Sequence, residues 1–400
     1  MKRYITNIEN FPVVCDRLPE SSLIYLGIVF STGSFYEEPH INGVTHFIEH
    51  MLFKGSQRYS QKDISYIVEE NGGYINAFTT KDYTCFYIKM LKEKFTILSD
   101  VLLQVCFNPS FSKEEFLKEK DVIKSEILSV RDNPWEYMME LSEAELLRDS
   151  GYALPIEGTA ESIENLTFDK MKDYYYHSFL GSNVVGFISG GFEKKDVDFF
   201  INSVPIRSYN HGDFNFYDIV HKNLEFKEDF EQGYISVYFS CGEYLLTDRY
   251  ACFLISYMIA GISSGRLFQK LREELGLCYN IDSEVTLYKN GGYLSVNGEV
   301  ASDKILEFEG KILLELREIY RVGFTEREFL IAKNQFLLNL ISSFESLNGR
   351  FDLSVKQFIN YGKLSDKWEI MRKIDEYSLQ RLNDIYKEIY QKGFSVCKMF

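Results

Sequence analysis

Histidine is missing from a large part of this chain of 400 residues, because all six histidines lie at or before position 221. Residues 222–400 therefore cannot form a metal site with imidazole ligands, and we expect at most one such site per chain, within residues 1–221. Cysteine offers no alternative. The seven cysteines are widely spaced without a Cys-x-x-Cys pair, which is typical of buried free thiols in a reducing compartment, and nothing marks one of them as a nucleophile.

Positive charge and long apolar segments are also scarce. Lys and Arg number 44 against 59 Asp and Glu, which gives a net charge of -15. This balance argues against a nucleic-acid partner, because phosphate binding needs clustered basic side chains, and it favours the approach of basic peptides. The most apolar stretch, 250–262, is too short to span a bilayer, and no apolar run of signal-peptide length follows Lys2 and Arg3. We therefore expect a soluble, cytoplasmic protein without an export signal that binds neither nucleic acid nor membrane.

The remaining composition is that of a folded protein with two domains. Hydrophobic residues make up 45% and charged residues 26%, and the length exceeds what one hydrophobic core usually supports. In the first half we expect a strand, two helices, two hairpin strands and a helix, at 23–31, 43–54, 61–70, 74–79, 83–91 and 95–105. The second half repeats this order at 234–240, 247–260, 267–275, 278–287, 292–299 and 303–320.

The repeated order predicts an internal duplication. We expect the α+β class, with two homologous αβ sandwich domains built from antiparallel-rich sheets and helices. The N-terminal domain would span 1–205, a polar linker 206–228, and the C-terminal domain 229–400. Because of where the histidines lie, the N-terminal domain would hold the metal and the C-terminal domain none.

The segment from Gly43 to Gly55 contains the strongest chemical signal. His46, Glu49 and His50 form a His-x-x-Glu-His pattern, and on a helix they fall within an arc of roughly 100°. Two imidazoles one turn apart can hold one zinc ion, and a carboxylate at the same level can reach a water on that ion. The same short pattern would fit two surface histidines beside a solvated glutamate, so further residues are needed to decide.

A catalytic zinc site usually takes three protein ligands and leaves one position for water. With no third histidine nearby, we expect a carboxylate from the long charged helix predicted at 114–131. Glu119 and Glu126 lie two turns apart on nearly the same face of that helix. One could ligate the metal while the other orients a histidine, and their spacing alone does not choose between them.

Several segments around and beyond the His-x-x-Glu-His pattern match the motifs of a known family. They are Gly33-Ser34, Glu37, His46–Gly55, Asn76-Ala77-Phe78-Thr79, Glu119–Glu126, Asp132-Asn133-Pro134, Ser264–Phe268 and Leu271–Tyr279. With them the chain resembles, over nearly its whole length, the inverzincin peptidases, the group of pitrilysin, insulin-degrading enzyme and mitochondrial processing peptidase. Its size suits the processing-peptidase-like branch, in which single chains carry two domains.

The resemblance implies a role for each matching residue. His46, His50 and Glu126 would be the ligands of Zn2+, Glu49 the general base, and Glu119 the carboxylate that orients a histidine ligand.

In the second part of the resemblance, Asn76 and Ala77 would lie on an edge strand that pairs with the substrate backbone. Arg272 and Tyr279 would help to bind the substrate carbonyl and the developing oxyanion. Without the resemblance, Arg272 would be read as a solvated helix residue and Tyr279 as an ordinary strand residue.

The implied function is that of a zinc-dependent metalloendopeptidase that hydrolyses unfolded or short peptides. The resemblance also implies a clamshell of four homologous units, made by a homodimer or by a heterodimer with a homologous chain, in which Arg272 and Tyr279 face the partner's zinc site. One alternative is a non-catalytic or partner-dependent subunit of a processing-peptidase-like complex, although such subunits usually lose the motifs that this chain keeps. Another is a zinc enzyme of a different class, such as an amidase.

Overall fold

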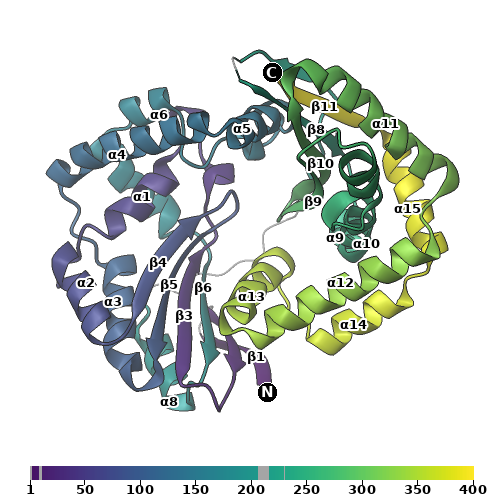
Figure 1. Ribbon diagram of the computed structural model, residues 1–400. Helices are drawn as coiled ribbons and strands as arrows, with labels where there is room; N and C mark the ends of the chain where they lie inside the picture. The colour runs from purple at the N-terminus through teal and green to yellow at the C-terminus, as the bar shows by residue number, and fades with distance from the viewer. Residues whose placement is uncertain (1, 9–10, 206–215, 229) are drawn as a thin grey trace. The chain divides into compact units, whose positions relative to one another are not determined.

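The computed structural model describes residues 2–8, 11–205, 216–228 and 230–400. The chain divides into two compact units, each assembled from three segments. Unit 1 consists of Met1–Ser129, Leu154–Asp213 and Ser342–Asp366, and unit 2 of Val130–Ala153, Phe214–Ile341 and Lys367–Phe400 (Figure 1). Each unit is described by itself below.

Unit 1 is built on a sheet with the strand order β1-β2-β6-β3-β5-β4. Its strands are β1 (Lys2–Ile8), β2 (Phe11–Arg17), β3 (Leu23–Phe30), β4 (Tyr74–Thr79), β5 (Thr84–Leu91) and β6 (Val184–Gly190). All neighbours pair antiparallel except β2 and β6, which are parallel. The strand β4 therefore forms one edge of this sheet.

The sheet of unit 2 has the same topology over five strands. Its order is β7-β11-β8-β10-β9, again with one parallel pair, β7 and β11, and antiparallel neighbours elsewhere. The strands are β7 (Leu224–Phe226), β8 (Gln232–Phe239), β9 (Asn280–Tyr288), β10 (Gly291–Ala301) and β11 (Phe394–Met399). Strand for strand, this order matches β2-β6-β3-β5-β4. The predicted α+β class with two similar sheet-and-helix domains is confirmed.

Helices cover both sheets. Those of unit 1 are α1 (Val44–Leu52), α2 (Gln61–Glu70), α3 (Phe95–Phe107), most of α4 (Lys113–Asp132), α6 (Ala160–Asn165), α7 (Phe168–Tyr174), α8 (Lys194–Ser203) and α13 (Leu347–Tyr361). Those of unit 2 are α5 (Pro134–Leu146), α9 (Tyr244–Thr247), α10 (Arg249–Ser256), α11 (Ile305–Val322), most of α12 (Glu326–Glu345), α14 (Lys367–Glu376) and α15 (Leu379–Lys392). Among the described residues, no helix is both long and apolar enough to cross a membrane.

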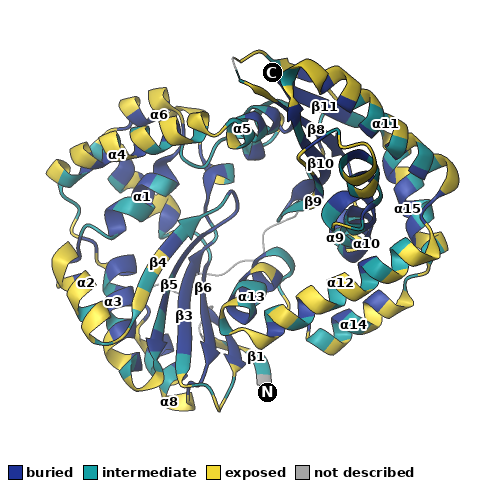
Figure 2. Ribbon diagram, in the orientation of Figure 1, coloured by how far each residue is buried: buried dark blue, intermediate teal, exposed yellow. Residues whose placement is uncertain are grey.

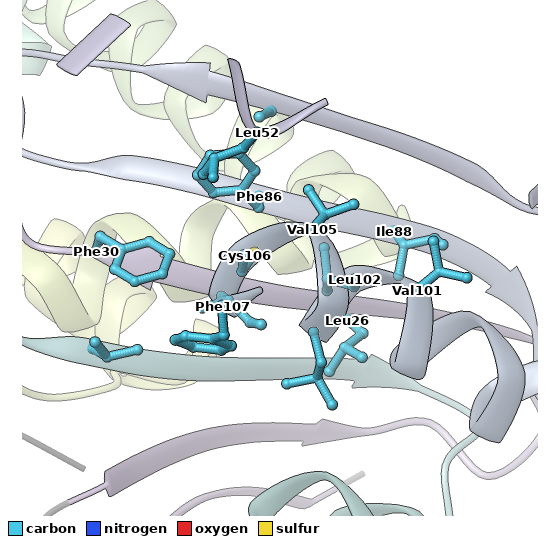
Figure 3. Packing of buried hydrophobic residues seen from close by; sticks show 14 of the residues in the cluster. Leu26, Phe30, Leu52, Phe86, Ile88, Val101, Leu102, Val105, Cys106 and Phe107 are labelled. Atoms are coloured by element: carbon cyan, nitrogen blue, oxygen red, sulfur yellow. The ribbon is translucent and has the colours of Figure 1, made fainter. Parts of the chain in front are cut away.

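The alternation of side chains along β3 builds two separate cores. Leu26 and Phe30 point to one face, where they pack with residues of α3 such as Leu102 and Phe107 (Figure 3). Tyr25 lies in the cluster on the other face, with residues of α13 that include Phe351. Because both faces are covered, the central strands are buried along most of their length (Figure 2).

Two helices are exchanged between the halves of the sequence. The helix α13, from the second half, packs against β2, β3 and β6, whereas α5, from the first half, packs against β8 and β11. The sequence predicted contiguous domains at 1–205 and 229–400. In the structure, each compact unit also includes a segment from the other half of the sequence, which carries α13 in unit 1 and α5 in unit 2. Positions 206–215 of the expected linker lie outside the described residues.

Candidate metal centre

The helix α1 carries the His-x-x-Glu-His pattern, and its first turn is held by buried contacts. Gly43, at its N-cap, has φ +90, and an added Cβ would lie 2.5 Å from the carbonyl oxygen of Glu157, so this position requires glycine. The buried carboxylate of Glu37 accepts hydrogen bonds from the backbone N–H groups of Gly43 (2.6 Å) and Thr45 (2.8 Å). Burial raises the pKa of Glu37, although these hydrogen bonds oppose the shift. A remote side chain therefore caps this helix.

His46, His50 and Glu126 come together in unit 1. The Nε2 atoms of the two histidines are 3.1 Å apart, and Oε2 of Glu126, on α4, lies 3.6 Å from Nε2 of His50 and 4.0 Å from Nε2 of His46. One ligand atom from each of the three residues can be chosen so that all lie within 4.8 Å of one another. Two neutral imidazoles and a carboxylate form a donor set that catalytic zinc sites use.

The spacing of these atoms fits a zinc ion. Tetrahedral zinc with bonds of about 2.0–2.1 Å places its ligand atoms roughly 3.3 Å apart. The observed separations of 3.1, 3.6 and 4.0 Å lie within several tenths of an ångström of that value, and a small rotation of the Glu126 side chain would close the difference. Glu126 is partly exposed, with 43% of its side chain accessible, so its rotation is not blocked by packing.

Glu119 occupies a different position from Glu126, although both lie on α4. Its Oε1 lies 2.8 Å from Nδ1 of His50, and its Oε2 lies 2.6 Å from Nζ of Lys54. With the Nδ1 side of the His50 ring engaged by a carboxylate, Nε2 is the nitrogen left for a metal. The geometry therefore assigns different positions to the two glutamates that the sequence spacing left undecided.

The two histidines differ in their tendency to take up a proton. Burial, followed by the neighbouring charge of His50, lowers the pKa of His46 to about 4, with Glu119 opposing the shift. Burial would also lower the pKa of His50, but the hydrogen bond to Glu119 and the charges of Glu126 and Glu49 outweigh it and raise that pKa. Near neutral pH, His46 is therefore uncharged, as a metal ligand must be.

Glu49 projects from the same helix and contacts a strand of the sheet. The hydroxyl of Thr79, at the end of β4, donates a hydrogen bond of 2.5 Å to Oε2 of Glu49. Burial raises the pKa of Glu49, and the hydrogen bond from Thr79 and the charge of His50 act against this shift. A carboxylate with a raised pKa beside a metal site is suited to take up and return a proton.

The sequence analysis gave no role to Thr79 or Lys54, which contact Glu49 and Glu119. The sequence did contain a signal for Thr79, which belongs to the segment Asn76-Ala77-Phe78-Thr79 that carries the resemblance and shares a strand face with Ala77. The sequence predicted that Lys54 ends the helix at 43–54, but α1 ends at Leu52, so helical periodicity does not give the direction of the Lys54 side chain.

Asn76 and Ala77 lie on β4, one of the two edge strands that the described residues give the unit 1 sheet. The backbone N–H of Ala77 donates to Oδ1 of Asn76 (2.9 Å), and the Asn76 amide donates to the hydroxyl of Tyr74 (3.0 Å). The side-chain oxygen of Asn76 is therefore the hydrogen-bond acceptor for the backbone N–H of Ala77 on this edge strand.

Arg272 and Tyr279 belong to unit 2, and the structure places them next to each other. The Arg272 guanidinium lies 5.9 Å from the ring centre of Tyr279 and 4.7 Å from that of Phe268. Tyr279 is 77% exposed, which is unusual for so large a ring. The two side chains form a pair of a partly exposed cation and an exposed phenol on unit 2.

Comparisons with known proteins point to the same peptidase family in both halves of the chain. Residues 13–160 match the family profile described as insulinase (peptidase family M16), and residues 165–336 match the profile described as peptidase M16 inactive domain. An uncharacterized zinc protease of Bacillus subtilis, YmxG, is 28% identical over 99% of this chain and 97% of its own length. An uncharacterized zinc protease of Rickettsia felis is 26% identical over 92% of this chain and 90% of its own length.

Solved structures show the same fold. A protein from Pseudomonas fluorescens described as a peptidase M16 inactive domain superposes with a TM-score of 0.89 at 17% identity, covering 100% of this chain and 98% of that chain. A protease from Helicobacter pylori superposes with a TM-score of 0.88 at 16% identity, covering 100% and 99%.

Proposed function

The chain belongs to the insulinase (M16) family of peptidases, and we propose that it is a zinc-dependent endopeptidase that hydrolyses unfolded or short peptides. One observation carries the proposal. His46, His50 and Glu126 direct three ligand atoms to one place, and the partly buried carboxylate of Glu49 projects from the helix that carries the two histidines. A zinc ion bound there would polarise the substrate carbonyl and lower the pKa of a coordinated water.

Glu49 would move the proton in this reaction. In its ionised form it accepts a proton from the attacking water, and it then delivers that proton to the leaving amine. Thr79 holds one oxygen of the carboxylate, which leaves the other oxygen for the water. Glu119 keeps the His50 ring oriented and takes no part in proton transfer.

The substrate would bind in an extended form along β4. A peptide added to this edge pairs through its backbone, and it would replace the Asn76 side chain at the N–H of Ala77. Backbone pairing of this kind requires a substrate segment whose own backbone is not already paired, which supports unfolded or short peptides as substrates.

Arg272 and Tyr279, exposed on unit 2, would bind the substrate carbonyl and stabilise the oxyanion of a paired chain's site. The protein would therefore act as a homodimer, or as a heterodimer with a homologous chain.

The proposal is tested by zinc content and peptide cleavage measured together. We expect one zinc per chain, cleavage of a quenched fluorescent peptide panel, and loss of cleavage on chelation. His46→Ala, His50→Ala and Glu126→Gln should each lose tight zinc binding, whereas Glu119→Gln should weaken it by roughly 10–100-fold. A chain that binds zinc but cleaves no peptide would instead be the non-catalytic subunit. Loss of the metal in Glu119→Gln with retention in Glu126→Gln would contradict the ligand assignment.

A further inference from the structure

The backbone of Lys54 is fixed directly after the helix that carries the metal ligands. Its N–H donates to the carbonyl of Met51 (3.1 Å), which continues the last turn of α1. The carbonyl of Gly55, the next residue, accepts from the backbone N–H of Ser110 (3.0 Å). Lys54 is therefore held from both sides, and its side chain starts from a defined point next to α1.

The side chain of Lys54 reaches the carboxylate that supports His50. Nζ of Lys54 lies 2.6 Å from Oε2 of Glu119, while Oε1 of the same carboxylate lies 2.8 Å from Nδ1 of His50. The Glu119 side chain is only 4% exposed, and that of Lys54 is 21% exposed. Each oxygen of a buried carboxylate thus has one partner, and water has little access to replace either of them.

This pair differs from the other lysine–glutamate contacts nearby. Lys118, one residue before Glu119, lies 2.8 Å from both Glu114 and Glu115, but its side chain is 58% exposed. Exposed pairs of that kind contribute little, because solvent screens the charges and both side chains lose rotational freedom. A lysine that meets a nearly buried carboxylate also fixes the rotation of that carboxylate, and this rotation decides whether Oε1 faces the histidine.

We propose that Lys54 is a positioning residue of the metal centre, which holds Glu119 so that Nδ1 of His50 stays bound and Nε2 stays directed at zinc. The proposal rests on the function proposed above, because it assumes that zinc binds between His46, His50 and Glu126. Lys54 touches neither metal nor substrate in this account. Its effect passes through Glu119, and removal of Lys54 leaves a buried carboxylate free to rotate away from His50.

The test is a double-mutant cycle on zinc affinity, measured on the full chain by competition with a chromophoric chelator and without peptide. Lys54→Met should weaken zinc binding by roughly 10–100-fold, as Glu119→Gln does. The double variant should bind zinc no more weakly than Glu119→Gln alone, because both changes remove one interaction. Lys54→Arg, which keeps the cation, should restore most of the affinity, and Lys118→Met, the matched control, should leave it unchanged.

Two results would overturn the role of Lys54 alone: a Lys54→Met chain with wild-type affinity, or losses that multiply in the double variant. If Lys54→Met does not fold, Lys54→Gln enters the same cycle with the same two outcomes. Wild-type protein that binds no zinc would overturn the proposed function itself, and this inference with it.

Discussion

The hydroxyl of Thr79 donates a hydrogen bond of 2.5 Å to Oε2 of Glu49 and so joins the edge strand β4 to the helix α1. The strand proposed to bind the substrate backbone is therefore connected directly to the proposed general base. A substrate that pairs with β4 would lie beside a strand whose last residue, Thr79, is hydrogen-bonded to the proposed base Glu49. In the proposed mechanism, this contact would couple the position of the strand to proton transfer through Thr79.

Thr79→Val should lower kcat by roughly tenfold, because it removes a hydrogen bond to a charged group without changing side-chain volume much. The pH profile should change as well. The hydrogen bond from Thr79 lowers the pKa of Glu49, so its loss raises that pKa further. A base acts in its ionised form, and the acid limb of kcat/KM should therefore move to higher pH. Rates of peptide cleavage across pH measure both effects.

Thr79→Ser provides the control, since it keeps the hydroxyl. It should retain most of the activity, and zinc affinity should be unchanged in both variants. Equal activity in Thr79→Val and wild type, or a loss of zinc in Thr79→Val, would show that this hydrogen bond does not act on the base.

An ion cluster connects the exchanged helix α13 to its sheet, and this leads to a prediction on stability. Asp16, on β2 and fully buried, accepts a hydrogen bond from Arg350 of α13 and lies 3.5 Å from Nε of Arg3. Asp16→Asn leaves the buried guanidinium of Arg350 and the partly buried guanidinium of Arg3 without their shared counter-charge. The free energy of unfolding should fall by about 3–5 kcal/mol in urea titrations.

Glu164→Gln, which removes the exposed ion pair with Lys124, is the matched control and should change stability by less than about 1 kcal/mol. Similar stability of Asp16→Asn and Glu164→Gln would show that the cluster does not hold α13 on its sheet.

Local signals predicted much of the fold. The helix at 61–70 and the strand at 74–79 have the predicted bounds, because Ser60 and Asp63 form a capping box and Gly72 takes a positive φ that ends the segment. The helix expected near 247–260 corresponds to α10 and the π-helical turn that follows it, but it begins only at Arg249. Asp248, with φ -144 and ψ 38, separates α9 from α10, and a π-helical turn follows at Tyr257–Gly261. Backbone angles of one residue are not visible in apolar periodicity.

The exchange of α5 and α13 could not be predicted from the sequence. The apolar periodicity of a helix shows that it has an apolar face, but not against which sheet that face packs. Within the site, the His-x-x-Glu-His spacing predicted one helix face, and the structure brings His46, Glu49 and His50 together on α1. The separate positions of Glu119 and Glu126 required atomic contacts. Lys54 and His50 engage Glu119, while Glu126 lies near both Nε2 atoms.

The proposal that two chains share each active site makes a prediction about mixtures of inactive chains. One variant carries Glu49→Gln with an intact Arg272 and Tyr279, and the other carries Arg272→Ala with Tyr279→Phe and an intact metal centre. After random subunit exchange, half of the dimers would be mixed, and each would contain one complete site. Cleavage should recover to roughly a quarter of wild type by counting sites in a two-fold dimer.

Subunit exchange itself must be confirmed with differently tagged chains. If exchange is complete and the mixture stays inactive, both elements come from one chain and the shared site is wrong. Full activity of a strictly monomeric chain would contradict it equally.

The most direct measurement of the central claim compares zinc content and peptide cleavage in Glu49→Gln. Glu49 is proposed to transfer a proton and not to bind the metal, and the replacement keeps the size of the side chain. The account predicts one zinc per chain, bound as tightly as in the wild type, together with a loss of kcat of at least about 100-fold. Wild-type cleavage by zinc-loaded Glu49→Gln would contradict the account, since the reaction would then proceed without its proposed base.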